Sequence, residues 1–352
     1  MTSAPLPPSS RERQARLLSL LDAFPRCRVA VVGDVVADEF LTGRISRVSR
    51  EAPVLILRYH DTRVLPGGAG NAANNVGTLG GRVDLFGLAG KDEAGKALLR
   101  SFCKGVRLRG IVRPPDYRTP TKTRVLAGGI HSAKQQIVRV DREPEGGPPP
   151  DEARAFEAGV LAAVGEADAV LLSDYGYGLV TPGLADRILA RVSARKGRQV
   201  PILIDSRYNL GAYRGLTACT PNEPEVEQLL GVRIGDNAEA LEKAGRALLR
   251  RSRMRAVLVT RGSRGMALFQ PGAATVHIPI FGSDEIADVT GAGDTVMATM
   301  SLALAAGASF EDASRLANYA GGIVVMKRGT ATVSAEELRH AIESDKSSSG
   351  QS

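Results

Sequence analysis

Short runs of apolar residues recur along the chain, and a polar residue follows each of them at its carboxyl end. The runs alternate with segments of helical periodicity and show no polar face of their own. Such runs are typical of strands in a parallel sheet that helices cover on both faces, and in open α/β sheets ligands bind at the carboxyl edge of the strands. The pattern therefore predicts a three-layer α/β sandwich with a mostly parallel central sheet and a site along one edge. The polar residues at the five strand ends are Asp34, Asp174, Asp205, Asn222 and Thr260.

Two stretches, at about residues 38–60 and 117–142, alternate apolar and polar residues instead. This period of two indicates half-exposed antiparallel strands. We interpret them as a small β-lid over the site, contributed by two separate parts of the chain. A peripheral hairpin without a ligand role is the alternative, and the basic residues of both stretches favour the lid.

The two ends of the chain differ from the part between them. Residues 1–27 are predicted to form an N-terminal extension helix packed on the body, with Ser9 and Glu12 as a capping box. One large domain would span residues 28–342, and the polar segment 343–352 is predicted to be a disordered tail.

Composition narrows the class of protein. Hydrophobic residues make up 43% of the 352 residues, yet no run approaches the roughly 18 apolar residues that a membrane span needs. Three scattered cysteines are expected to be reduced thiols, as in a cytoplasmic protein. The net charge of +8 suits a solvated basic surface or an anionic ligand. Because basic residues are dispersed and aromatic residues are only 4%, no nucleic-acid partner is expected.

The stretch DVTGAGDTVMATM, residues 288–300, places a Gly-Ala-Gly turn directly before an apolar segment. Residues 295–306 are apolar nearly all round, which predicts a helix buried in the middle of the protein. The N–H groups of its first turn then lie inside and need a partner. A bound anion would satisfy them at the positive end of the helix dipole, and Gly291 and Gly293 let the backbone approach it closely.

Asp294 stands at the start of this helix, beside the predicted anion site. A carboxylate there could take the proton from a hydroxyl that attacks a phosphoryl group. An ordinary pKa of about 4 makes it a weak base, which is tolerable because a loose phosphoryl-transfer transition state loses the proton late. The alternative is that Asp294 only caps the helix.

A second glycine-rich cluster, PGGAGNAANNVGTLGG, spans residues 66–81. Gly67 and Gly68 permit a close backbone approach, and the Asn71 and Asn75 amides lie one helical turn apart, where they suit sugar hydroxyls. Polar capping of a helix is the alternative. The GAGNAA within this cluster matches a dinucleotide-binding pattern but does not follow the first strand, so a nicotinamide oxidoreductase is disfavoured.

The chain resembles the PfkB/ribokinase family of carbohydrate kinases over about residues 28–340. Three elements carry the resemblance: GGAGNAA early, DVTGAGDT late, and Asn222-x-x-Glu225 between them. The resemblance implies a ribokinase-like fold and an ATP-dependent sugar kinase that uses Mg²⁺. It also implies a homodimer that forms through the lid, whose exposed strand edges a partner could cover.

The same resemblance assigns roles to individual residues. Asp294 would be the catalytic base, and Gly291, Ala292 and Gly293 would form the anion hole. Glu225 would help to hold Mg²⁺ through water, and Asp288 with the backbone near Gly329 would hold a monovalent cation such as K⁺. The residues expected to contact the sugar are Asp34, Asp38, Gly67, Gly68 and Asn71. Those expected to line the nucleotide are Asn222, Glu225, Thr260, Gly262, Gly265 and Asn318.

Within the family, segments such as GDVVADEF and YRGLTACTPNEPE are most similar to kinases that phosphorylate heptose 7-phosphate at C1 in ADP-heptose synthesis. No His-x-Gly-His of a nucleotidyl-transferring half occurs, so a stand-alone kinase is expected. Tyr177 stands where these relatives are expected to have lysine, and Ser206-Arg207 replaces Pro-Lys. Arg207 keeps the positive charge. Other candidates for holding a substrate phosphate are the lid cations Lys122, Arg124 and Arg139.

Two alternatives remain beside the heptose 7-phosphate kinase. One is another kinase of the same family, acting on ribose, fructose, a phosphorylated sugar or a nucleoside. The other is a catalytically silent sugar- or nucleotide-sensing protein on the same scaffold, which the joint presence of Asp294, the glycines, Asn222 and Glu225 disfavours.

Overall fold

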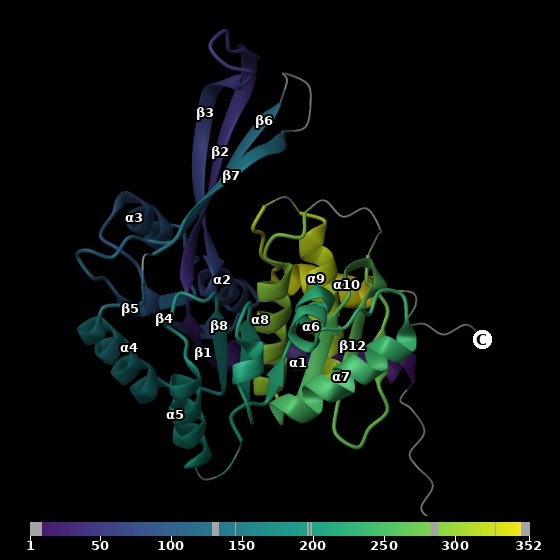
Figure 1. The fold of residues 1–352 in the computed structure, drawn as a ribbon. Helices are drawn as coiled ribbons and strands as arrows, with labels where there is room; N and C mark the ends of the chain where they lie inside the picture. Colours follow the sequence, from purple (N-terminus) through teal and green to yellow (C-terminus); the bar gives the residue numbers. More distant parts are fainter. Residues whose placement is uncertain are drawn as a thin grey trace, which may run out of the picture.

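The computed structural model describes residues 9–128, 134–144, 146–195, 197, 199–282, 288–327 and 329–345 (Figure 1). Within these residues the larger sheet has nine strands in the order β13-β12-β11-β10-β9-β8-β1-β4-β5. β12 pairs antiparallel with both β11 and β13, and all other neighbouring strands pair in parallel. The strands are β1 (Arg28–Gly33), β4 (Arg82–Leu88), β5 (Val106–Val112), β8 (Ala169–Asp174), β9 (Ile202–Ser206), β10 (Ala218–Cys219), β11 (Ala256–Thr260), β12 (Met266–Phe269) and β13 (Val276–Ile278).

Helices cover both faces of this sheet, as the fully apolar strands require. In β1, Val29 and Val31 belong to one buried hydrophobic cluster, whereas Ala30 and Val32 belong to the other. The first cluster contains residues of α1 (Ser10–Ala23), α2 (Ala69–Thr78), α3 (Glu93–Arg100), α8 (Ala292–Ala305), α9 (Phe310–Val325) and α10 (Ala335–Ser344). The second contains residues of α4 (Pro150–Ala163), α5 (Pro182–Ser193), α6 (Glu223–Leu230) and α7 (Ala238–Ser252). Three short 3₁₀ turns complete the body, η1 (Phe24–Arg26), η2 (Leu210–Ala212) and η3 (Gly262–Arg264).

A second sheet projects from the body at the top of the view in Figure 1. Its strands are β2 (Val35–Val48), β3 (Leu55–Gly68), β6 (Thr121–Gly128) and β7 (Gln135–Arg142), in the order β3-β2-β6-β7. We call this sheet the lid. The expected contribution from two separate parts of the chain is confirmed, because two hairpins build it. The purely antiparallel pairing expected for it is wrong, because β2 and β6, the two inner strands, run parallel. Residues 129–133 of the second stretch lie outside the described residues.

Helix α8 is the buried helix that the apolar segment predicted. Every residue from Asp294 to Ala305 is buried, and the helix packs against β1, β8 and β9 and against α2 and α9. Its N-terminus follows Gly291, whose φ of 80° is left-handed. The tight turn therefore aims the first helical amides at the carboxyl edge of the sheet.

The helix predicted before residue 28 is α1, and the capping box between Ser9 and Glu12 is present. At the other end, α10 continues through Ser344, past the expected domain boundary at residue 342, and the predicted tail beyond Asp345 lies outside the described residues. None of the helices in the described ranges is long and apolar enough to span a bilayer.

Candidate active site

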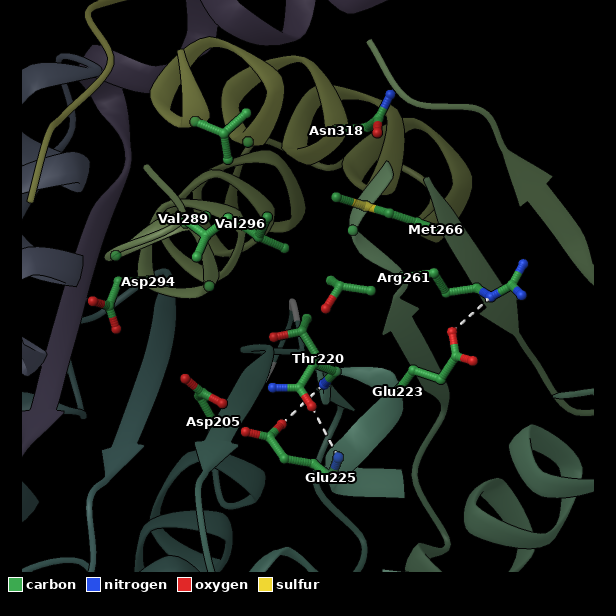
Figure 2. A pocket seen from close by; sticks show the side chains of 18 of the residues that line it. Asp205, Thr220, Glu223, Glu225, Arg261, Met266, Val289, Asp294, Val296 and Asn318 are labelled. Carbon is green, nitrogen blue, oxygen red and sulfur yellow. Dashed lines mark hydrogen bonds and ion pairs between the residues drawn. The ribbon is translucent and has the colours of Figure 1, made fainter. Parts of the chain in front are cut away.

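Two adjoining cavities lie at the carboxyl edge of the main sheet, and four of the five polar strand-end residues line the larger one, namely Asp174, Asp205, Asn222 and Thr260. The larger cavity has a volume of about 600 Å³, and Figure 2 shows many of its lining side chains. The smaller one, of about 180 Å³, lies beneath the lid strands β2 and β6. Lid strands, together with loops and α8 of the main body, line the small cavity, whereas residues of the main body line the large one. Four residues line both cavities: Tyr175, Arg207, Gly291 and Asp294.

Asp294 is a buried carboxylate at the junction of the two cavities, 5% exposed. Asn71 donates a hydrogen bond from Nδ2 to its Oδ2 at 2.9 Å, and the Tyr175 hydroxyl donates to its Oδ1 at 3.2 Å. Burial raises the pKa of Asp294 to about 7, the hydrogen bond from Asn71 opposes this, and the charge of Asp38 adds to it. The sequence predicted that Asp294 would be a weak base with the pKa of an ordinary aspartate. In the folded protein its pKa is instead near neutrality.

The amides at the start of α8 open onto the large cavity. Gly291, Ala292 and Gly293 all line it, and no side chain of the described residues caps the helix at Gly291. The Ala292 amide donates to the Val289 carbonyl at 3.2 Å, so the turn is closed by one backbone hydrogen bond. The positive end of the helix dipole faces the cavity beside this turn, in a space where an anion could bind. The sequence placed the Gly-Ala-Gly turn at this helix end, and its role as an anion site stays a prediction.

The small cavity is strongly basic. Lys122, Arg124, Arg139 and Arg207 line it, together with the acidic Asp38 and Asp294. Arg124 pairs with Asp38 at 2.6 Å, and Arg139 pairs with Asp141 at 2.9 Å. Lys122 and Arg207 form no ion pair with any described carboxylate. The pKa of Lys122 is lowered by burial and by the charge of Arg207, so an anion bound here would relieve an unfavourable accumulation of charge.

The predicted sugar-binding residues divide into two groups. Asp38 and Gly68 line the small cavity, and Asp38 also accepts a hydrogen bond from the Thr330 hydroxyl at 2.8 Å. Asp34 lines neither cavity. It accepts hydrogen bonds from the backbone amides of Tyr175 and Tyr177, at 2.8 and 3.3 Å, and burial raises its pKa to about 7. Asp34 therefore orders the loop after β8.

Two further predicted residues hold parts of the site in place. Gly67 lies at the end of β3, where it pairs with Val36 of β2. Asn71, in the first turn of α2, donates to the Gly291 carbonyl at 3.2 Å as well as to Asp294. Asn71 thereby ties the early glycine-rich cluster to the late one, 220 residues away in the sequence.

The predicted nucleotide residues are together around the large cavity. They are Asn222, Glu225, Thr260, Gly262, Gly265 and Asn318. Asn222 and Glu225 form a reciprocal capping box at the start of α6, with both hydrogen bonds at 2.9 Å. Burial raises the pKa of Glu225, opposed by the hydrogen bond to the Asn222 amide. The element that resembles a metal-binding motif therefore also serves to begin a helix.

Two further residues of the large cavity are Asp205 and Thr220 (Figure 2). The sequence placed Asp205 at the ligand edge of the sheet without giving it a role, and it missed Thr220. The Asp205 carboxylate has no hydrogen-bond or ion-pair partner among the described residues. Burial and then the charge of Asp294 raise its pKa to about 8. The buried Thr220 Oγ1 also lacks a partner there.

A second missed group is an ion-pair cluster at the far side of the large cavity. Glu223 is buried and pairs with Arg264 at 2.9 Å and Arg261 at 3.2 Å. All three residues line the cavity. Because Arg261 precedes η3 and Arg264 is its last residue, the cluster fixes the segment that carries Gly262 and Gly265.

Asp288 and Gly329, predicted to lie together, do so. The Asp288 carboxylate accepts hydrogen bonds from the Thr290 amide at 2.9 Å and the Gly329 amide at 3.0 Å. Burial alone would raise the pKa of Asp288, but these hydrogen bonds lower it. The carboxylate joins the loop before α8 to the turn after α9.

The model of the pfkB family carbohydrate kinases matches residues 28–338. The chain is 43% identical over 310 residues to the bifunctional protein HldE of Geobacter sulfurreducens, a match that covers 88% of this chain and 61% of that protein. It is 44% identical over 325 residues to the bifunctional protein HldE of Methylococcus capsulatus, covering 92% and 65%. The chain thus spans less than two thirds of the length of these curated relatives.

Two solved structures share the fold at low sequence identity. Arabidopsis thaliana ribokinase complexed with ribose and ATP has a TM-score of 0.68 and 20% identity, covering 91% of this chain and 99% of that one. Escherichia coli phosphofructokinase-2 in complex with substrates and products has a TM-score of 0.71 and 19% identity, covering 90% and 98%. Both likenesses confirm the ribokinase-like fold.

The family model that matches most of the chain describes carbohydrate kinases, enzymes that transfer a phosphate group to a hydroxyl of a carbohydrate. The chain belongs to the pfkB family of carbohydrate kinases. Kinases with this fold use ATP and a divalent metal, and the substrate of the family is a sugar or sugar phosphate.

Substitutions at two glycines distinguish an effect on the proposed anion site from an effect on the packing of the fold. A Cβ at Gly293 would meet no protein atom within 4 Å, so Gly293→Ala should keep the stability of the native protein. Turnover should fall about tenfold or more, because the methyl group enters the space beside the helical amides.

Gly68→Ala is the comparison for Gly293→Ala, since it adds the same methyl group where the fold has no room for it. Gly68 has a φ of +57°, and a Cβ there would lie 2.6 Å from the Asp34 carbonyl oxygen. We expect it to lose roughly 1–3 kcal/mol of unfolding free energy. Urea unfolding and coupled ADP detection would measure both effects, and wild-type turnover of Gly293→Ala would contradict the anion site.

Proposed function

We propose that the protein is an ATP-dependent kinase that phosphorylates heptose 7-phosphate at C1 in the synthesis of ADP-heptose. The observation that carries the proposal is the position of Asp294, between a large cavity of nucleotide size and a small basic cavity. The 43–44% identity to HldE proteins supports the choice of heptose within the family.

Asp294 is the proposed general base. The sugar hydroxyl gives its proton to the Asp294 carboxylate while its oxygen forms a bond to the γ-phosphorus of ATP. The bond from that phosphorus to the bridging oxygen breaks, and ADP leaves. A base with a pKa near the working pH is efficient, and burial gives Asp294 such a pKa, of about 7. The amides of Gly291, Ala292 and Gly293 stabilise the charge on the transferred group.

The large cavity offers oxygen ligands for Mg²⁺, the divalent metal that we propose. Glu225, Asp205 and Thr220 all line it. The buried Thr220 Oγ1 has no partner among the described residues, and none of those residues forms a hydrogen bond with the Asp205 carboxylate. Hard oxygen ligands of this kind, completed by phosphates and water, suit Mg²⁺. When bound, the ion would neutralise charge on the phosphates of ATP. We also propose K⁺ at Asp288 and the backbone near Gly329, since each Asp288 oxygen retains a lone pair beyond its hydrogen bond.

The small cavity supports a phosphorylated sugar. Lys122 and Arg207, which form no ion pair with a carboxylate of the described residues, are suited to the phosphate, and Arg139 is a further contact. Asp38 and the backbone at Gly68 are suited to the hydroxyl groups. Since Asp294 lines the same cavity, the sugar hydroxyl and the base can meet there.

The lid supports a homodimer. Of the twelve exposed large hydrophobic side chains in the described residues, seven lie on the lid strands, namely Ile45, Val48, Leu55, Tyr59, Ile137, Val138 and Val140, and Val54 lies in the connection between β2 and β3. Its outer strands, β3 and β7, have open edges, and a second lid could cover both the edges and the apolar side chains.

The assignment of the base predicts a pH dependence. Because only the deprotonated carboxylate accepts the proton, turnover should fall as the pH drops through about 7, the pKa of Asp294. Asp294→Asn should reduce turnover about 10²–10⁴-fold. The acid limb of the pH profile, which is the fall of turnover at low pH, should disappear in this variant. Coupled ADP release across the pH range would show this. Asp294→Asn turning over at the wild-type rate would contradict the assignment.

The substrate assignment predicts a ranking of sugars. Heptose 7-phosphate should have the highest kcat/KM in a panel with unphosphorylated heptose, fructose 6-phosphate and ribose. Lys122→Gln should raise the KM for the phosphorylated sugar about tenfold or more, because a hydrogen bond to a charged group is lost. Arg142→Gln is the matched control, since this lid cation lines neither cavity. A preference for an unphosphorylated sugar would contradict the proposal.

A charged substitution on the apolar surface of the lid tests the dimer. Val138 is 49% exposed on β7, and Val138→Glu should convert a dimer into a monomer in light scattering. Val232→Glu makes the same change at a 44% exposed site on the body and should leave the dimer intact. A monomeric wild-type protein at micromolar concentration would rule out the lid dimer.

A further inference from the structure

Tyr175 lies between the lid and the candidate base. It follows β8 and lines both cavities. Its hydroxyl donates to Asp294 Oδ1 at 3.2 Å, and the Nζ atom of Lys122, on lid strand β6, lies 4.9 Å from the centre of its ring. One side chain therefore contacts the carboxylate through its hydroxyl and the lid through its ring.

Each oxygen of the Asp294 carboxylate accepts one side-chain hydrogen bond. Asn71 donates to Oδ2 at 2.9 Å and Tyr175 to Oδ1. A carboxylate held at both oxygens cannot turn about its Cβ–Cγ bond without breaking one of them. Without Tyr175, no hydrogen bond from the described residues would hold Oδ1, and the remaining lone pairs would lose their fixed direction toward the small cavity.

The Tyr175 hydroxyl is a permanent donor. Burial, followed by the charge of Asp294, raises the pKa of Tyr175 well above its ordinary value. The phenol is thus protonated wherever the kinase operates, and its proton is directed at the carboxylate.

Three buried groups fix the loop that carries Tyr175. Asp34 accepts from the Tyr175 amide at 2.8 Å, and Asp174 accepts from the Gly176 amide at 3.0 Å. The ring packs on Gly68, where a Cβ would lie 3.2 Å from it. Asp174 is itself held by the hydroxyls of Ser206 and Tyr213, both at 2.8 Å. Such a supported loop gives the hydroxyl a defined place.

We propose that Tyr175 is a positioning residue for phosphoryl transfer, which orients Asp294 toward the substrate hydroxyl and joins it to Lys122 of the lid. The proposal rests on the proposed role of Asp294 as the base. A hydrogen bond to the charged form of a carboxylate lowers its pKa. Tyr175 therefore opposes the effect of burial and keeps a larger fraction of Asp294 deprotonated at neutral pH.

Other charged groups also act on this carboxylate. Asp38 raises the pKa of Asp294, and Lys122 lowers it. The charged and titratable groups that share the two cavities with Asp294 are Asp38, Lys122, Arg124, Arg139, Asp174, Asp205, Arg207, Glu223, Glu225, Arg261 and Arg264. All of them are unchanged in a Tyr175→Phe variant, so a shift of the acid limb in that variant reports the lost hydrogen bond.

Tyr175→Phe tests the proposal, because it removes the hydroxyl and keeps the ring. We expect kcat to fall about 10–100-fold, since a misdirected base loses catalytic geometry. The acid limb of kcat should move to higher pH, and the KM for ATP should change little. Tyr177→Phe is the matched control in the same loop. Its hydroxyl lies 3.5 Å from Glu143 and lines neither cavity, so its profile should match the wild type.

The outcomes separate this proposal from the proposed function. If Asp294→Asn is inactive while Tyr175→Phe keeps the wild-type kcat and acid limb, the role of Tyr175 is overturned and the base assignment stands. If Asp294→Asn is fully active, the base assignment fails instead. Circular dichroism establishes folding. Should Tyr175→Phe not fold, the native chain labelled with 3-fluorotyrosine gives the test. Fluorine acidifies the phenol and strengthens its hydrogen bond, so the acid limb should move to lower pH, and an unmoved limb overturns the role.

Discussion

The burial of one helix determines the chemistry of this protein. Because α8 is apolar on all sides, it lies inside the molecule, and its first turn brings Asp294 and a backbone turn without a side-chain cap to the edge of the sheet. Burial has two effects there. It leaves helix-end amides without water as a partner, and it raises the pKa of Asp294 to about 7. The proposed anion site and the proposed base therefore have the same physical origin.

Such a helix end needs support, and other polar groups that are buried in the site provide it. Asn71 reaches from α2 to both Asp294 and the Gly291 carbonyl. Asp34 lines neither cavity, and together with Asp174 it holds the loop of Tyr175 through its backbone amides. Buried carboxylates are costly unless they are hydrogen-bonded, and here those hydrogen bonds fix the site. Among the described residues Asp205 is the exception, because its carboxylate lines the large cavity without a hydrogen-bond partner there.

The two cavities differ in chemistry because different parts of the fold line them. The large one draws on the ends of the main strands and on α6, α8 and α9, with Glu223 and its arginines at the far side. The small one takes its cations from the lid strands and from Arg207. Under the proposed function, a change in the lid would therefore alter the proposed sugar site and leave the large cavity intact.

The sequence alone determined the sheet, the two-part lid, the buried helix and the residues that carry the family resemblance, because hydrophobic periodicity and glycine-rich turns are local signals. The tertiary structure decided what local signals cannot encode. The parallel pairing of β2 with β6 depends on how the two hairpins dock. The role of Asp34 depends on a loop 141 residues later, and the contact of Tyr175 with Asp294 joins segments 119 residues apart. The pKa of Asp294 depends on desolvation by segments from the whole chain, so only the folded protein could reveal it.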